Sequence, residues 1–352
     1  MKMKFKRYWI LSSIVFIVML INSKASLADP WERLGDIPGP PIGAFRATLM
    51  NGEVYVTAGE GALFSFQVYD PSSDTWTRKA DQPTHGVRYG ACAVDGILYV
   101  IGGQGPLTAA VDAYDPGTDT WTRKADMINV RGEFDVGVVD GIIYAIGGRV
   151  LVDTEAGLAA EVNTNITEAY DPGTDTWTRK ADMINARRMP AVCVIDGRIY
   201  AAGGQGLDVY VEMYDPRTDT WTPLVGSTGP IQQNVVLTNW AVSGTVLLDE
   251  KSGDSKMYIM GGWSTQNRIW VYNPASNILE LLDIEMSAPK GWAGDFVFNN
   301  KIYIMGGWTS GDGYQSDVWV FDPYAAPPAQ QIRDVDAKGK QPSAWGTLKI
   351  AE

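Results

Sequence analysis

Residues 98–129 read LYVIGGQGPLTAAVDAYDPGTDTWTRKADMIN. An apolar segment precedes Gly102-Gly103, Tyr114 begins a Tyr-Asp-Pro triplet, and Trp121 lies seven residues after that tyrosine. Proline fixes φ and aspartate bonds nearby backbone groups, so Asp-Pro followed by small polar residues predicts a turn. The short β-branched and aromatic segments around it predict strands. The stretch therefore predicts antiparallel strands joined by tight turns.

The same pattern recurs about every 45–58 residues. Gly-Gly stands at 102–103, 147–148, 203–204, 261–262 and 306–307, and Gly59-Glu60 is interpreted as a degenerate sixth copy. The aromatic residue before Asp-Pro or Asn-Pro is Tyr69, Tyr114, Tyr170, Tyr214, Tyr272 and Phe321. Seven residues later stand Trp76, Trp121, Trp177, Trp221 and, in the fifth copy, Leu279. Four short strands per repeat are typical of a propeller blade.

These repeats resemble the kelch repeat, which combines an apolar strand, Gly-Gly, a Tyr-Asp pair and a tryptophan at fixed offsets. The resemblance covers about residues 30–323, and it departs from the pattern at Glu60, at Leu279 and after Phe321. It implies an all-β, six-bladed kelch-type β-propeller over residues 29–323.

The last repeat lacks its tryptophan strand. Pro328 holds the expected position, in a stretch rich in proline and alanine. The missing strand is found at the other end of the chain, where Trp31 follows Asp29-Pro30. We therefore predict that residues 30–34 form the outer strand of the sixth blade. This pairing closes the ring and removes exposed strand edges.

The two ends of the chain fall outside the repeats. Residues 1–28 combine a basic start, an apolar run over 9–21 and small residues before Asp29, which predicts a cleaved export signal, with an uncleaved anchor as the alternative. We expect a protein exported to the periplasm or the extracellular space. Residues 324–352 are polar and rich in proline, so we expect a flexible tail. Cys92 and Cys193 occupy equivalent points of non-adjacent repeats, so we expect two buried, unpaired thiols.

Charge limits the choice of partner. The net charge is −12, and loss of the five Lys and Arg of residues 1–28 would make it −17. Nucleic-acid binding rests on a basic surface, so this charge argues against it. We expect a monomer without a membrane span after cleavage.

Function is expected on one face of the propeller, because the loops after strand two and the links between blades open on the same side. Loops held by a rigid scaffold usually carry binding residues. The candidates are Arg88, Tyr89, Arg131, Glu133, Arg187, Arg188, Trp240, Trp263, Arg268, Trp292 and Trp308. They also fit a second interpretation, in which they fill the channel and satisfy backbone groups.

Two function classes remain open. One is a scaffold that binds a protein or carbohydrate ligand, the role that the resemblance to kelch propellers implies. The other is a sugar-acid mutarotase or epimerase, resembling the exported sialic-acid mutarotases, with Glu133 as base and Arg131, Arg187 or Arg188 on the carboxylate. His85 is the single histidine, so a zinc site with several histidines cannot form. We expect no metal and no cofactor, and we favour the scaffold.

Overall fold

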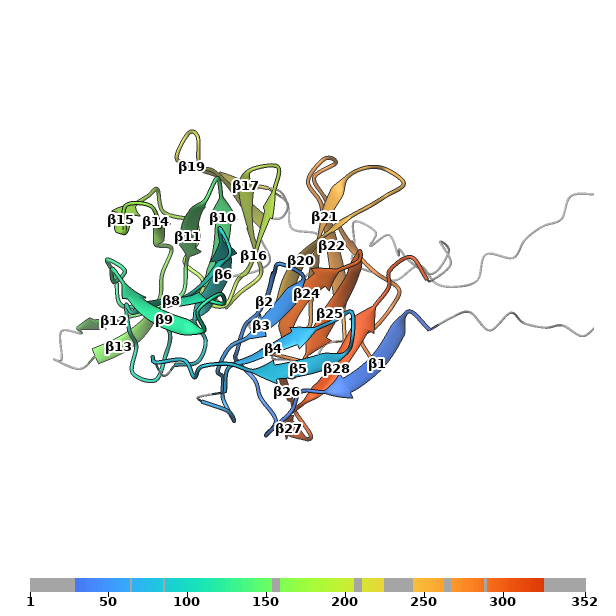
Figure 1. Ribbon diagram of the computed structural model, residues 1–352. Helices are drawn as coiled ribbons and strands as arrows, with labels where there is room; N and C mark the ends of the chain where they lie inside the picture. Colours follow the sequence, from blue (N-terminus) through green and yellow to red (C-terminus); the bar gives the residue numbers. More distant parts are fainter. Residues whose placement is uncertain are drawn as a thin grey trace, which may run out of the picture.

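The computed structural model describes residues 29–63, 65–84, 86–153, 159–205, 211–224, 243–262, 267–287 and 290–325. Over these ranges the chain forms six four-stranded antiparallel sheets and no helix. The innermost strands contact one another in a closed ring around a central channel. The predicted six-bladed propeller is therefore confirmed (Figure 1).

Each blade is one sheet. Blade one contains β2 (Ala47–Met50), β3 (Glu53–Val56), β4 (Gln67–Asp70) and β5 (Thr75–Arg78). Blade two contains β6 (Gly90–Val94), β7 (Ile97–Ile101), β8 (Val111–Asp115) and β9 (Thr120–Lys124). Blade three contains β10 (Asp135–Val139), β11 (Ile142–Ile146), β14 (Thr167–Asp171) and β15 (Thr176–Arg179).

The other three blades repeat this order. Blade four contains β16 (Ala191–Ile195), β17 (Arg198–Ala202), β18 (Val211–Asp215) and β19 (Thr220–Pro223). Blade five contains β20 (Ser243–Leu248), β21 (Ser255–Met260), β22 (Ile269–Asn273) and β23 (Ile278–Leu281). Blade six contains β24 (Gly294–Phe298), β25 (Lys301–Met305), β28 (Asp317–Phe321) and β1 (Trp31–Asp36). Two small hairpins, β12 (Arg149–Asp153) with β13 (Ala159–Asn163) and β26 (Trp308–Thr309) with β27 (Gly313–Tyr314), follow the second strands of blades three and six.

The first strand of the chain closes the ring, as predicted. β1 pairs with β28, with Trp31 opposite Phe321, and Figure 1 shows the blue strand beside the red one. The two rings stack with centroids 4.7 Å apart, and Trp31 is only 8% exposed. Its Nε1 donates to the carbonyl of Glu285 at the end of blade five, over 2.9 Å. The tryptophan thus completes blade six and fastens it to blade five.

The repeated Tyr, Asp and Trp residues join neighbouring blades. In blade three the Tyr170 hydroxyl donates to Asp175 over 2.6 Å, and this carboxylate also accepts from the Ala125 N–H of the link between blades two and three, over 2.9 Å. Trp177 Nε1 donates to the Ala125 carbonyl over 3.0 Å. The same tryptophan bond recurs from Trp121 to Ala80 and from Trp221 to Ala181. The motif therefore fastens each blade to the link that leads into it from the preceding blade.

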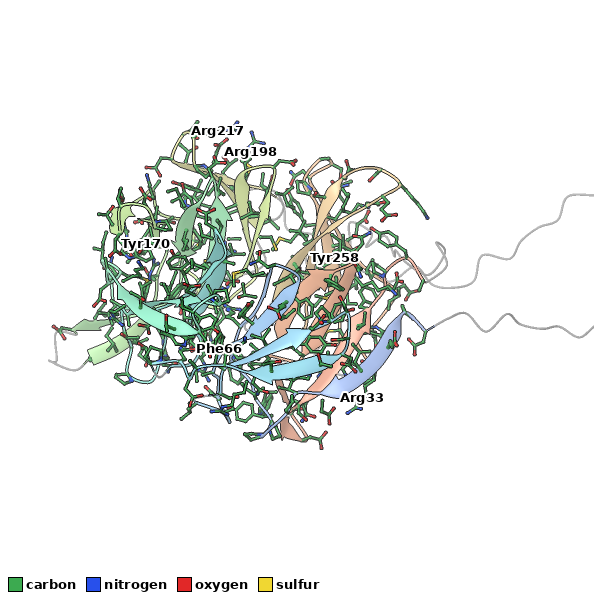
Figure 2. The ribbon with its side chains drawn as sticks, viewed as in Figure 1. Arg33, Phe66, Tyr170, Arg198, Arg217 and Tyr258 are labelled. Atoms are coloured by element: carbon green, nitrogen blue, oxygen red, sulfur yellow. The ribbon has the colours of Figure 1, made fainter. Side chains whose placement is uncertain are left out.

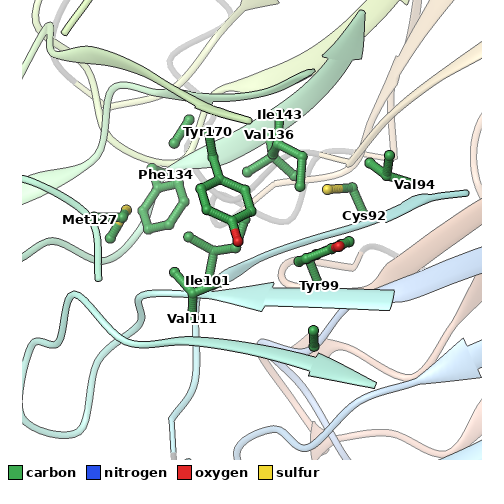
Figure 3. Close-up of a cluster of buried hydrophobic side chains, with 12 residues drawn as sticks. Cys92, Val94, Tyr99, Ile101, Val111, Met127, Phe134, Val136, Ile143 and Tyr170 are labelled. Atoms are coloured by element: carbon green, nitrogen blue, oxygen red, sulfur yellow. The ribbon is translucent and has the colours of Figure 1, made fainter. Parts of the chain in front are cut away.

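Hydrophobic clusters fill the spaces between blades. Figure 3 shows the cluster between blades two and three, in which Phe134 lies beside Tyr170 and Cys92 lies near Val136. Cys92 and Cys193 are both buried and unpaired, as predicted, and burial raises the pKa of both thiols above the usual value.

One glycine assignment from the sequence is wrong by one residue. Glu60 bridges to Gly43 as Gln104 of blade two bridges to Val87, so Ala58-Gly59, and not Gly59-Glu60, occupy the Gly-Gly position. A Cβ on Gly59 would come within 2.5 Å of the Gly43 carbonyl oxygen, which explains why this glycine is the one retained. Glu60 is therefore the first residue after this pair, in the loop after strand two.

The propeller has two unlike faces. We call the side with the blade links and the loops after strand two the mouth face, and the side with the Asp-Pro turns the turn face. β12–β13 and β26–β27 lie at the lower edge of Figure 1, on the mouth face. Arg198 and Arg217 lie at the upper edge of Figure 2, on the turn face, where both pair with Asp215.

Candidate functional site

Five equivalent residues encircle the opening of the channel on the mouth face. We call them the mouth ring: Ala44, Arg88, Glu133, Met189 and Trp292. Each precedes an inner strand and has a φ between 53° and 59°. This left-handed backbone is unfavourable for residues with a side chain, and bulky residues adopt it rarely.

Hydrogen bonds between blades hold this backbone in place. The Ala44 N–H donates to the Trp292 carbonyl and the Arg88 N–H to the Ala44 carbonyl, each over 2.9 Å. Glu133 N–H donates to Arg88 over 2.7 Å, and Met189 N–H to Glu133 over 2.6 Å. Residues in strained conformations persist where the surrounding structure fixes them. The mouth ring is thus one hydrogen-bonded chain that runs from blade six through blades one, two, three and four.

The mouth ring surrounds a hollow at the entrance of the channel. Its volume is about 410 Å³ when the space open to solvent is included. The lining residues are Ala44, Phe45, Arg46, Arg88, Glu133, Phe134, Met189, Pro190, Trp292 and Ala293. Apolar walls with a few converging charged groups are the usual composition of a ligand site.

A cluster of ion pairs is centred on Glu133, whose side chain is 1% exposed. Its Oε1 lies 2.8 Å from Arg88 Nη1, and its Oε2 lies 3.3 Å from Arg188 Nη1 and 3.5 Å from Arg149 Nε. Arg88 also pairs with Glu60 over 2.8 Å. The side chains of Arg88 and Arg188 remain 19% and 21% exposed, so a ligand can reach both guanidinium groups.

Aromatic rings flank this cluster. The guanidinium carbon of Arg88 lies 4.4 Å from the centre of the Trp292 ring, a cation–π contact. Trp308 of the loop after β25 lies next to Trp292, with ring centroids 6.4 Å apart. Trp292 Nε1 donates to the sulfur of Met189 over 3.4 Å. The hollow thus presents planar, polarisable groups beside accessible positive charge.

Further down the channel, Arg46 pairs with Asp135 over 3.1 Å. Asp295 lies near both. Burial raises the pKa of the Asp295 carboxyl to about 7, the negative charge of Asp135 adds to this rise, and Arg46 opposes it. The channel floor therefore holds a carboxyl group that gains a proton close to neutral pH.

Two predicted candidates lie inside their blades and not in the hollow. Arg131 is 0% exposed; it pairs with Glu168 over 3.3 Å and donates to the carbonyls of Ala145, Gly147 and Ile166. Arg187 is 4% exposed and pairs with Glu212. Each joins a blade link to the third strand of its own blade. Lys290 of blade six does the same with Asp317.

The other candidates divide between the mouth and elsewhere. Arg88, Glu133 and Trp292 line the hollow, and Arg188 and Trp308 lie beside it. Tyr89 is buried and donates its hydroxyl to Ala58, and Arg268 is exposed just before β22. Trp240 and Trp263, like His85, lie outside the described residues.

Sequence reasoning missed Met189, Ala44, Arg46, Glu60 and Arg149. Ala44 and Met189 could have been found from the sequence, because they hold the same repeat position as Arg88, Glu133 and Trp292. Placing Glu60 and Arg149 required the bridges that align the loops after strand two.

Six blades closed by an N-terminal strand place the chain in the class of six-bladed β-propellers. The family model "Kelch motif" matches residues 85–128, 131–184, 186–226 and 293–324. The chain belongs to the kelch-repeat family.

Similar proteins extend this comparison. Two F-box/kelch-repeat proteins of Arabidopsis thaliana are similar to parts of the chain. One is 32% identical over 132 residues, which are 36% of this chain and 30% of the relative. The other is 37% identical over 86 residues, 23% of this chain and 22% of the relative. The match thus spans less than a third of either relative.

A solved structure titled "Structure of YjhT" superposes with a TM-score of 0.65 at 17% identity, over 82% of this chain and 96% of that one. At this identity the likeness shows the fold. Within the described ranges, no group of three His, Cys, Asp or Glu side chains is arranged to hold a metal ion. No helix of the described part is long and apolar enough to cross a membrane.

Proposed function

We propose that this propeller is an exported binding protein, and that a protein or carbohydrate ligand docks in the hollow on its mouth face. A kelch propeller fits a binding or scaffold role in general. One observation carries the more specific proposal: the mouth ring keeps a single backbone conformation in five blades while its side chains differ in every one. Different side chains on one fixed frame are what recognition of an asymmetric ligand requires.

The turn face shows the opposite behaviour. The Asp-Pro turns of blades two and three, residues 115–120 and 171–176, are identical. Their aspartates serve the turns themselves, since Asp115 accepts from Gly117 N–H and Asp171 from Gly173 N–H, each over 2.8 Å. These side chains are accounted for by local structure, so the turn face offers little that is specific to a ligand.

The chemistry of the hollow supports the same proposal. Tryptophan and arginine dominate the energetic centres of binding interfaces, because they combine large contact area with hydrogen-bonding groups. Arg88 and Trp292 form such a pair at the centre of the mouth face. Tryptophan faces also stack on flat apolar groups of a ligand.

The mutarotase alternative gains no support from the geometry. It assigned the base to Glu133 and the carboxylate contact to Arg131, Arg187 or Arg188. Arg131 and Arg187 pair with Glu168 and Glu212 inside their own blades. Arg188 does reach Glu133, but it pairs with that carboxylate, which is 1% exposed and also lies against Arg88 and Arg149, so the group assigned as base is enclosed by three arginines.

A binding screen tests the proposal. The purified protein is applied to a glycan array and a peptide array, and hits are measured by calorimetry. Trp292→Ala should weaken binding of a hit by more than about 1 kcal/mol, the loss that marks an energetically important contact. The matched controls Thr118→Ala and Thr174→Ala on the turn face should bind as the parent does. If the turn variants lose binding and Trp292→Ala does not, the ligand uses the other face.

A further inference from the structure

The β12–β13 hairpin of blade three is a two-stranded sheet that stands out from the propeller. Figure 1 shows it at the lower left, on the mouth face. It is formed by the loop after strand two of its blade. The equivalent loop of blade six forms a shorter hairpin, with two residues in each strand. A two-stranded ribbon is marginally stable in water, and a third strand or a packed face stabilises it.

One face of this hairpin is apolar throughout. Val150 pairs with Val162, and Val152 pairs with Ala160, so the four side chains share a face. Val152 is 39% exposed and Val162 38% exposed. Leu151, on the other face, is 52% exposed. Apolar side chains gathered in this way on a protruding element mark an interaction surface.

On the edge of β12 that faces away from β13, one residue pair forms an antiparallel bridge, and the pairing does not continue. Arg149 donates its N–H to the Gly132 carbonyl over 2.8 Å and accepts from the Gly132 N–H over 3.2 Å. In an antiparallel ladder the residues that bond to one side alternate. The N–H and C=O groups of Leu151 and Asp153 therefore point to the same side as those of Arg149. No described residue continues the ladder there beyond Gly132.

Two of the residues that most often block pairing at an edge are missing from the described residues of this hairpin. Natural edge strands are protected by lysine, proline, bulges or a covering segment. The described residues of β12 and β13 contain no lysine and no proline. An open edge beside an apolar face is the surface that an extended peptide joins in strand addition.

Charge indicates the kind of partner. Arg149, the one basic residue of the two strands, is 6% exposed and paired with Glu133 and Glu161, whereas Asp153 is exposed. The whole chain carries a net charge of −12, so two copies repel each other. A segment with lysine or arginine between apolar residues complements this surface.

We propose that the β12–β13 hairpin binds an extended, basic segment of a partner protein, which pairs with the free edge of β12 as a third strand. Backbone bonds to Leu151 and Asp153 provide the pairing, and alternate apolar side chains of the segment pack beside Val150 and Val152, the β12 side chains of the apolar face. This interaction is separate from ligand binding in the hollow.

The test uses the full-length protein and a fluorescent peptide, KVTVKVTVK, with binding followed by anisotropy at low salt. Leu151→Pro removes an outward N–H while it leaves the β12–β13 bonds of Val150 and Val152 in place. Val152→Lys puts a positive charge on the apolar face. Each change should weaken binding about tenfold or more, because strand addition depends on main-chain bonds and on side-chain pockets. Leu248→Lys, at another exposed apolar position, on the turn face, is the control for Val152→Lys and should bind as the parent does.

Three further measurements decide the outcome. The peptide methylated at alternate backbone nitrogens and the acidic peptide EVTVEVTVE should bind weakly, and Trp292→Ala should bind KVTVKVTVK normally. Circular dichroism checks that the variants remain folded. The proposal is overturned if KVTVKVTVK does not bind, if Leu151→Pro binds it as tightly as the parent, or if sedimentation shows that the hairpin instead joins two copies of the chain. Failure of Trp292→Ala to affect hollow ligands would count against the proposed function alone.

Discussion

Arg88 of blade two lies over the ring of Trp292 of blade six, with its guanidinium carbon 4.4 Å from the ring centre. The two residues are separated in the mouth ring by Ala44 of blade one, whose small side chain leaves the space between them open. Arg88 also holds Glu60 and Glu133, each over 2.8 Å. It is therefore the residue that joins the aromatic and the acidic sides of the hollow.

Arg88→Lys should weaken ligand binding nearly as much as Arg88→Ala. Lysine keeps the charge, but its ammonium group cannot stack on Trp292 and bond two carboxylates in the plane of a guanidinium. We expect each variant to lose at least about 1 kcal/mol of binding free energy in calorimetry. Full affinity in Arg88→Lys would show that charge alone is recognised.

Trp31→Ala should destabilise the whole propeller. The change removes a stacked, buried ring and its bond to Glu285, and truncation of a large aromatic residue in a core costs about 3–5 kcal/mol. Urea unfolding followed by circular dichroism measures this loss. Ile278→Ala, at a 49% exposed position, should cost less than about 1 kcal/mol. Equal stability of the two variants would mean that β1 does not hold the ring closed.

Arg131→Met should lower stability by about 3–5 kcal/mol, because it leaves the buried Glu168 carboxylate without its partner. Glu168→Leu added to Arg131→Met should recover much of the loss, since apolar pairs often replace buried ion pairs without cost. Breaking the exposed pair of Arg33 and Asp36, in which each side chain is 51% exposed, should change stability by less than about 1 kcal/mol. A double variant as unstable as Arg131→Met would show that the cost arises from packing and from the lost bonds to the Ala145, Gly147 and Ile166 carbonyls, and not from the unpaired carboxylate.

Stability should fall between about pH 4 and pH 7 through the Asp295 carboxyl. Its pKa is raised from 3.8 to about 7 in the folded state, so the folded protein holds this proton more tightly than the unfolded chain does. The contribution is fully present below pH 3.8 and is lost as pH rises through 7. Asp295→Asn should remove this dependence, and its advantage over the parent should be larger at pH 8 than at pH 5 in urea unfolding. An unchanged pH profile would contradict this assignment.

Much of the fold could be predicted because the same repeat pattern occurs six times in the sequence. The missing tryptophan after Phe321 and the spare Trp31 were enough to predict the closure. Glu60 was misplaced because a Gly-Glu pair resembles Gly-Gly more than Ala-Gly does, and only the bridge to Gly43 fixes the alignment.

The site was harder to predict for a physical reason. Arg131, Gly132 and Glu133 are consecutive, yet Arg131 enters the blade and Glu133 faces the hollow. The left-handed backbone at the mouth ring makes the two side chains point in different directions. No residue type in the sequence predicts this backbone, because Ala, Arg, Glu, Met and Trp all adopt it.

The hydrogen bond from Ala44 N–H to the Trp292 carbonyl joins blade one to blade six, and so connects the first blade to the last at the mouth. The conformational entropy of the mouth residues is thus lost when the propeller folds. Ligand binding then does not have to order these residues, because the surface is already arranged. Opening the closure at Trp31 should return that disorder to the mouth and weaken binding there, although Trp31 does not line the hollow.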